Sequence, residues 1–182
     1  MRHVVHASFG PLLLAACATT GKLPASPPGV VPESITVTSR SFSSGAAIPI
    51  DFTCDGSNTT PDVTWSSPPE GTKSLVITLD DLEPLGGNGA RWVVVDVKPE
   101  ARSIRAGEDV AAVGGRLGLN DVGEAGYHGP CPPRREGHHY ALRVLALDRA
   151  LGLPEAAVRD RVNAAMEGHV LGSGELVGTV SR

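Results

Sequence analysis

Short apolar runs separated by glycine and proline turns fill the chain from Ile35 onward, and this pattern restricts the fold more than any other feature. Residues 35–38 alternate between apolar and polar, and residues 75–79 are almost all apolar. Two further runs, 92–97 and 140–147, are rich in β-forming residues. Runs this short have the length of strands, and the residues between them favour turns. The pattern therefore predicts a mainly β chain with two stacked sheets.

One segment near the C-terminus has a helical period instead. Its apolar residues recur at spacings of three and four: Val158, Val162, Ala165 and Met166. Pro154 is a favourable first helical residue, and Gly168 is placed to end the helix. Residues 176–180 follow as a closing strand. The expected fold class is thus a two-sheet β-sandwich with one or two short helices near the C-terminus.

Charge and composition exclude several classes of function. The 16 Lys and Arg against 20 Asp and Glu leave a formal charge of −4, which provides no positive field for a nucleic-acid partner. No apolar run approaches the roughly 18 residues of a membrane-spanning helix. Phosphate-loop, GxGxxG and HExxH motifs are absent from the sequence, so the common short catalytic motifs do not account for its function.

The first residues have the features of an export signal. Arg2 precedes a weakly apolar stretch, and Leu14-Ala15-Ala16-Cys17 resembles the bacterial lipoprotein box. We therefore expect a signal peptide at 1–16, a lipidated Cys17 followed by a flexible Pro-rich tether at 17–34, and a folded domain at 35–182. The alternatives are a signal cut elsewhere or a misassigned start codon. The expected location is the cell envelope or periplasm, with membrane attachment through the lipid anchor.

Two cysteines remain once Cys17 is assigned to the anchor. Cys54 and Cys131 form an even pair in a compartment that permits oxidation, so we expect a disulfide between them. The alternative is a reactive thiol at Cys131, because two histidines follow at positions 138 and 139. Such a nucleophile requires a thiolate and a neighbouring base.

Polar and ionisable residues gather in three clusters at the ends of the predicted strands. The clusters are TCDGSNTTPDVTW at 53–65, LDDLEP at 79–84 followed by Arg91-Trp92, and GYHGPCPPRREGHHYALRVLALD at 126–148. In the third cluster a Gly/Pro loop leads into His138, His139 and Tyr140. Glycine lets a ligand approach the backbone closely, and successive N–H groups form anion-binding nests. The third cluster is therefore a candidate anion site.

These clusters, together with GHVLGSGELVG near the C-terminus, resemble the phosphatidylethanolamine-binding protein family, specifically its bacterial Raf kinase inhibitor-like branch. The resemblance covers nearly all of residues 35–182. It implies a β-sandwich with a small cavity that accepts phosphate-like anions, and no established catalysis. The ligand-binding residues that follow from it, with Glu83 added from the Asp81 loop, are Asp81, Glu83, Arg91, Gly129, Pro130, Cys131, His138 and Tyr140.

Two positions depart from the family pattern. The family usually reads DDPDAP where residues 80–85 read DDLEPL, and it has histidine where this chain has Arg91. A guanidinium can hold a phosphate or carboxylate through two hydrogen bonds. It can equally lie across Asp81 or Glu83 and close the cavity with an ion pair. We expect an altered pocket that stays open.

The expected function is that of an exported, lipid-anchored protein that binds a small phosphate-type anion or a phospholipid headgroup. No cofactor, metal or catalysis is expected. One alternative is a protein that inhibits a partner kinase or protease.

Another alternative is an enzyme, either a hydrolase that uses Cys131 with His138 or a metal site made by Asp81, His128, His138 and His139. Neighbouring strand residues point to opposite faces. We therefore expect one of His138 and His139 to point inward, where it is hydrogen-bonded, and the other to point into solvent.

Overall fold

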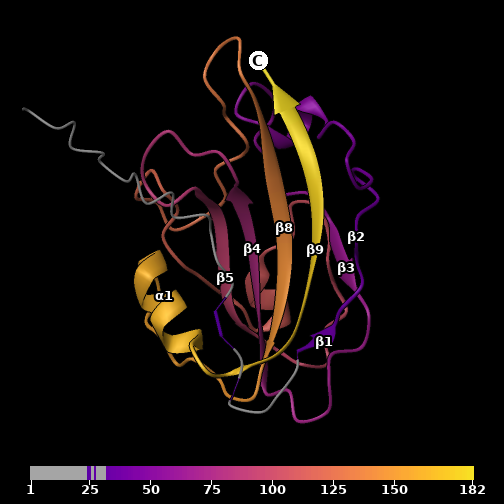
Figure 1. Ribbon diagram of the computed structural model, residues 1–182, viewed down its shortest axis with the longest axis vertical. Helices are drawn as coiled ribbons and strands as arrows, with labels where there is room; N and C mark the ends of the chain where they lie inside the picture. The colour runs from indigo at the N-terminus through magenta and orange to yellow at the C-terminus, as the bar shows by residue number, and fades with distance from the viewer. Residues whose placement is uncertain (1–23, 26, 28–31) are drawn as a thin grey trace, which may run out of the picture.

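A computed structural model describes residues 24, 25, 27 and 32–182 of the chain, which form two β-sheets (Figure 1). The large sheet has six strands in the order β1-β9-β8-β4-β5-β7, and the small sheet has the order β2-β3-β6. The strands are β1 Glu33–Ser34, β2 Val37–Thr38, β3 Val63–Trp65, β4 Ser74–Asp81, β5 Ala90–Val97, β6 Ser103–Ile104, β7 Arg116–Leu117, β8 Gly137–Leu147 and β9 Val170–Ser181. The helical elements are the 3-10 turns η1 Ile50–Phe52 and η2 Val110–Val113 and the helix α1 Arg159–Met166. The expected mainly β, two-sheet fold is confirmed.

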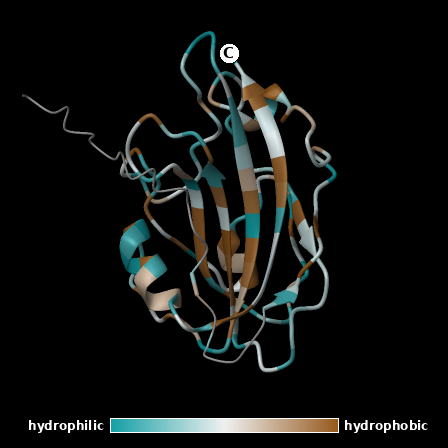
Figure 2. Cartoon of the chain, in the orientation of Figure 1, coloured by the Kyte–Doolittle hydropathy of each residue, from teal (hydrophilic) through white to brown (hydrophobic). Residues whose placement is uncertain are grey.

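The central strands of the large sheet are buried on both faces, because each face packs against a different layer. In β4, Leu75 and Ile77 belong to the core shared with the small sheet, whereas Val76 belongs to the core beneath α1. Figure 2 shows the hydrophobic residues concentrated along these central strands. A strand that is covered on both faces has a continuous run of apolar residues and no alternation with polar ones. This explains the composition of residues 75–79.

Helix α1 begins later than the sequence indicated. It starts at Arg159 and not after Pro154, and Val158, expected on its apolar face, lies outside the helix and is about half exposed. The preceding segment is held instead by backbone hydrogen bonds to the β7 region, from Ala156 N to Leu117 O and from Leu119 N to Ala157 O, both 2.9 Å. These contacts hold the chain there in a non-helical path. The predicted end is correct, since Gly168 follows the helix with φ of 77°.

Strand β9 is longer than expected, and its glycines allow the N-terminal segment to lie against it. A Cβ atom on Gly174 would lie 1.8 Å from the carbonyl oxygen of Ile35. β1 pairs in parallel with β9 through Glu33 opposite Gly172, so the last residues of the stretch assigned to the tether belong to the sheet. The predicted signal peptide and the lipidated Cys17 lie outside the described residues.

Candidate functional site

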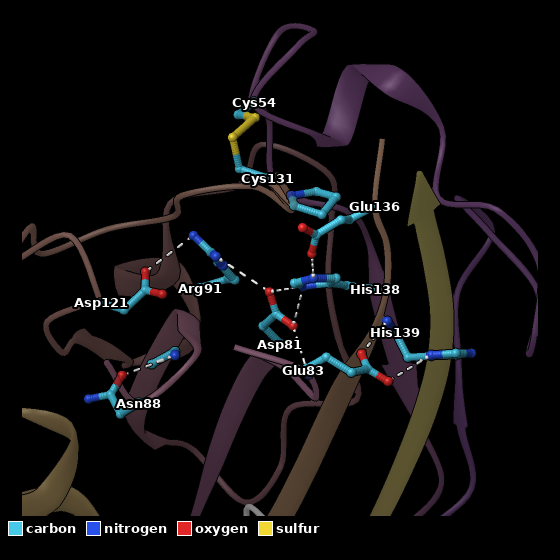
Figure 3. A network of polar contacts seen from close by, with 12 residues as sticks. Cys54, Asp81, Glu83, Asn88, Arg91, Asp121, Cys131, Glu136, His138 and His139 are labelled. Carbon is cyan, nitrogen blue, oxygen red and sulfur yellow. Dashed lines mark hydrogen bonds and ion pairs between the residues drawn. A yellow bond between two sulfur atoms is a disulfide. The ribbon is translucent and has the colours of Figure 1, made fainter. Parts of the chain in front are cut away.

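Three central strands of the large sheet bring ionisable residues together at one end of the molecule (Figure 3). Asp81 ends β4, whereas Arg91 and His138 are the second residues of β5 and β8. Because β4 is antiparallel to both neighbours, its end meets their beginnings. Asp81 lies opposite Tyr140 in the β4–β8 pairing, and Tyr140 belongs to the core between the two sheets.

The carboxylate of Asp81 is the centre of this cluster. His138 Nδ1 lies 3.0 Å from each of its two oxygens. Arg91 approaches from the other side and donates from Nη2 to Oδ2 at 3.5 Å. The side chains of Asp81 and His138 are almost completely buried, so water screens these charges only weakly.

The surroundings of His138 favour its protonated form. Burial on its own would lower the pKa of the imidazole, but the hydrogen bond and charge of Asp81 outweigh burial and raise the pKa. Glu136, whose carboxylate lies 3.5 Å from His138 Nε2, acts in the same direction. A protonated His138 carries a positive charge and donates from both ring nitrogens.

Two buried donors beside Asp81 have no close hydrogen-bond partner among the described residues. They are Nε of Arg91 and the hydroxyl of Tyr140, whose ring stacks on His138 with centroids 6.4 Å apart. Burial first, and then the charge of Asp81 and a long hydrogen bond to its carboxylate, raise the pKa of Tyr140, so its hydroxyl keeps its proton. Leaving a buried donor unpaired costs about 1–3 kcal/mol. A ligand that accepts hydrogen bonds would give these two donors partners.

Arg91 takes the ion-paired arrangement, the alternative to the open pocket expected from the sequence. It lies across Asp81 and also reaches Asp121, with Nη1 donating to Oδ1 at 3.3 Å. Asp121 belongs to the loop after β7, and sequence reasoning missed it because nothing in that loop's composition links it to Arg91, thirty positions away.

Glu83 contacts His139 instead of Arg91. Its carboxylate accepts from the His139 backbone N–H at 2.7 Å and lies 3.0 Å from His139 Nδ1. Glu83 also donates its own backbone N–H to Asp81 at 3.0 Å. The side chain of His139 is exposed and that of His138 is buried, so the predicted inward and outward orientations are confirmed.

The η1 region and the residues just after it hold in place the loop that contains Gly129, Pro130 and Cys131. A disulfide joins Cys131 to Cys54, as expected, with the Cα atoms 5.4 Å apart. Gly129 donates to Asn58 Oδ1 at 2.7 Å, and a Cβ there would lie 2.6 Å from the Phe52 carbonyl oxygen. Pro130 accepts from the Cys54 N–H at 3.2 Å. With its sulfur in a disulfide, Cys131 has no thiolate for the hydrolase alternative.

One group of side chains has the composition of a metal site. Asp81, Glu83 and His138 each offer a ligand atom, and these atoms lie within 4.8 Å of one another. Carboxylate and imidazole suit divalent cations such as zinc. The same atoms already serve the Asp81–His138 and Glu83–His139 contacts, with which a cation would have to compete. In the part of the chain that the structure describes, this group does not include His128 or His139.

Comparison with known proteins agrees with the fold and with the resemblance of the sequence. A family model described as phosphatidylethanolamine-binding protein matches residues 38–181. The chain belongs to this family. A UPF0098 protein of Aquifex aeolicus is 41% identical over 152 residues, which cover 80% of this chain and 88% of that relative.

Two other similar proteins extend the comparison. "Putative lipoprotein LppC" of Mycobacterium tuberculosis (strain ATCC 25618 / H37Rv) is 38% identical over 156 residues, covering 85% of this chain and 76% of the relative. The crystal structure of E. coli YbcL, a new member of the mammalian PEBP family, superposes with a TM-score of 0.76 at 27% identity. That match covers 81% of this chain and 98% of YbcL. Within the described residues, no helix has both the length and the apolar character to span a membrane.

Proposed function

We propose that the cluster at Asp81 binds a small phosphate-type anion, either free or as a phospholipid headgroup. The observation that carries the proposal is the buried donor Arg91 Nε, which has no partner among the described residues, with the Tyr140 hydroxyl beside it, which makes no close hydrogen bond there. His138, whose pKa is raised beside Asp81, favours a positive charge next to these donors. Phosphate oxygens accept hydrogen bonds from such groups, and bonds to charged groups are the strongest of this kind.

Two groups offset the negative charge of Asp81. Arg91 contacts Asp81, and so does His138, whose pKa is raised toward the charged form; Asp121 and Glu136 contact the same two side chains from outside. Asp121 engages only one terminal nitrogen of Arg91. Nη2 contacts Asp81, so Nε is the guanidinium nitrogen without a partner among the described residues, and a guanidinium suits the geometry of phosphate oxygens. Asp81 orients both cations around the ligand.

Titration calorimetry on the chain with Cys17→Ser tests anion binding, with inorganic phosphate, phosphoethanolamine and phosphatidylethanolamine vesicles as probes. We expect saturable binding of at least the first two, and binding of vesicles only if a headgroup is the ligand. Arg91→Gln should weaken binding about tenfold or more, because a hydrogen bond to a charged group contributes about 1.5–3 kcal/mol.

The matched control is Arg149→Gln. It removes the same charge just beyond the far end of β8 and should leave the affinity unchanged. Tyr140→Phe should weaken binding about fivefold, since it removes a neutral donor. Equal affinities for Arg91→Gln and Arg149→Gln, or no binding of any probe by the unsubstituted site, would refute the proposal.

The same protein, we propose further, is exported and anchored at Cys17. The residues before Cys17 and the LppC relative, whose name includes the word lipoprotein, support this. Detergent phase partitioning of the protein expressed in a bacterial host provides the test. The unsubstituted chain should enter the detergent phase, and Cys17→Ser should stay in the aqueous phase. Partitioning that does not depend on Cys17 would contradict the anchor.

A further inference from the structure

The disulfide has an arginine beside one of its two sulfurs. Arg182 Nη1 lies 3.2 Å from Cys131 Sγ and donates to the Pro132 carbonyl oxygen, also at 3.2 Å. The other edge of the guanidinium forms a two-pronged pair with Asp55, with both distances 2.7 Å. These four contacts hold the guanidinium against Cys131.

The two cysteines therefore have different electrostatic surroundings. Cys131 is contacted by Arg182 and is followed in its loop by Arg134 and Arg135, whereas Cys54 is followed directly by Asp55. Nearby cations stabilise a thiolate and nearby carboxylates destabilise it. When the disulfide opens, the negative charge is more stable on Cys131 than on Cys54. Both cysteine residues are partly exposed.

We propose that Cys54–Cys131 is a thiol–disulfide exchange site that opens in one direction. A thiolate of an external dithiol reductant attacks Cys54 Sγ, the Cys54–Cys131 bond breaks, and its electron pair leaves on Cys131 as a thiolate beside Arg182. The second thiol of the reductant then displaces Cys54 and closes the reductant's own disulfide. Two electrons have passed from the dithiol to the protein. Exchange prefers the more stable departing thiolate, which fixes the direction.

Opening this bond changes the attachment of the loop at 129–136. The disulfide is the covalent link between that loop and the η1 region, alongside hydrogen bonds such as those from Gly129 to Asn58 and from Cys54 to Pro130. Exchange therefore converts a covalently fixed loop into one held by these weaker contacts. Hydrogen exchange at residues 129–136 should accelerate on reduction, while exchange in β4 should change little.

Trapping the first step of the reaction tests the direction. The oxidised chain with Cys17→Ser, which has no other cysteine, is treated with reduced glutathione, quenched with acid, alkylated and mapped by mass spectrometry. We expect glutathione on Cys54 and the alkyl group on Cys131. Glutathione found mainly on Cys131 would overturn the proposal.

Variants of Arg182 test the cause of this preference. Arg182→Gln should slow reduction about threefold or more and reduce the preference for Cys54, because the departing thiolate loses its counter-charge. Arg149→Gln is the matched control, since it removes an arginine beyond the far end of β8 and leaves Arg182 and Asp55 in place. It should keep both the rate and the preference for Cys54. Unchanged kinetics and mapping in Arg182→Gln would refute the role of Arg182, and if that variant does not fold, the mapping of the parent chain still decides the direction.

Discussion

Asp80 and Asp81 are neighbours in the chain but serve different layers of the molecule. Asp81 faces His138 and Arg91 at the candidate site. Asp80 points to the α1 side, where the guanidinium of Arg159 lies 2.9 Å from its Oδ1 and that of Arg143 lies 3.2 Å from its Oδ2. Successive residues of a strand point to opposite faces, so two adjacent carboxylates supply both the site and the helix contact.

Asp80→Asn should destabilise the fold and leave ligand affinity intact. The substitution leaves the buried guanidinium groups of Arg143 and Arg159 without this carboxylate, and breaking a buried ion pair costs about 3–5 kcal/mol. Urea unfolding measures the loss. Phosphate titration of the variant at low temperature provides the second readout. A loss below about 1 kcal/mol would show that Asp80 does not stabilise the packing of α1.

Stability should depend on the ionisation of His138 with a defined sign. The pKa of His138 is raised in the folded state from its ordinary value of 6.5. Its contribution to the free energy of unfolding is then fully present below about pH 6.5 and is lost as the pH rises through the raised pKa. Urea unfolding between about pH 5 and 9 should show this loss in the parent chain and not in His138→Gln. If the free energy of unfolding of the parent chain rises relative to that of His138→Gln over this pH range, the stabilising role of protonated His138 is contradicted.

The ionisation of Asp62 should make stability depend on pH in the opposite direction. Burial would raise its pKa, but hydrogen bonds from the Ser41 hydroxyl, from the backbone of Arg40 and Ser41 and from Ser39 outweigh burial and lower it. The resulting stability is present above the ordinary value of 3.8 and is lost as the pH falls through the lowered pKa. Asp62→Asn should cost about 2 kcal/mol at neutral pH and less at pH 3. An equal loss of stability from Asp62→Asn at both pH values would contradict this prediction.

At the scale of elements, β9 shows how glycine positions allow two segments to approach closely. Gly174→Ala should destabilise the protein by about 1–3 kcal/mol, as overpacking does, because its Cβ would overlap the carbonyl of Ile35. Gly86→Ala is the control, since a Cβ there meets nothing within 4 Å. Chemical unfolding of both variants checks the difference. Equal stabilities would mean that the N-terminal segment shifts without cost.

Strands with a nearly continuous run of apolar or β-forming residues could be predicted from the sequence. Runs at 75–79, 92–97 and 140–147 predict β4, β5 and β8, whereas β9, which is longer, is predicted only at 176–180. The two-residue strands β1 and β7 are too short to have a period, and only their pairing with distant strands defines them. The same limit applies to the site. Asp81 and His138 lie at predictable strand ends, but Asp121 depends on how a loop folds back to Arg91.

For the whole molecule, the disulfide closes a loop between cysteines 77 positions apart. In the chain-entropy model such a cross-link adds about 4 kcal/mol by restricting the unfolded chain. The double variant Cys54→Ser and Cys131→Ser should therefore unfold at lower denaturant concentration than the oxidised chain. The fully reduced parent chain should behave like the double variant. Identical midpoints for oxidised and reduced chains would show that the cross-link does not restrict the unfolded state.

The N-terminal segment joins the large sheet at the end remote from the candidate site. Glu33 lies opposite Gly172, whereas His138 lies opposite Val180, and eight residues of strand span about 26 Å. Ala25 is also hydrogen-bonded near the end of α1, to Gly168 and Glu167. Eight residues from Cys17 to Ala25 reach at most about 28 Å. If Cys17 is acylated, the membrane attachment therefore lies at the opposite end of the domain from the Asp81 cluster, so that cluster would face away from the anchoring bilayer.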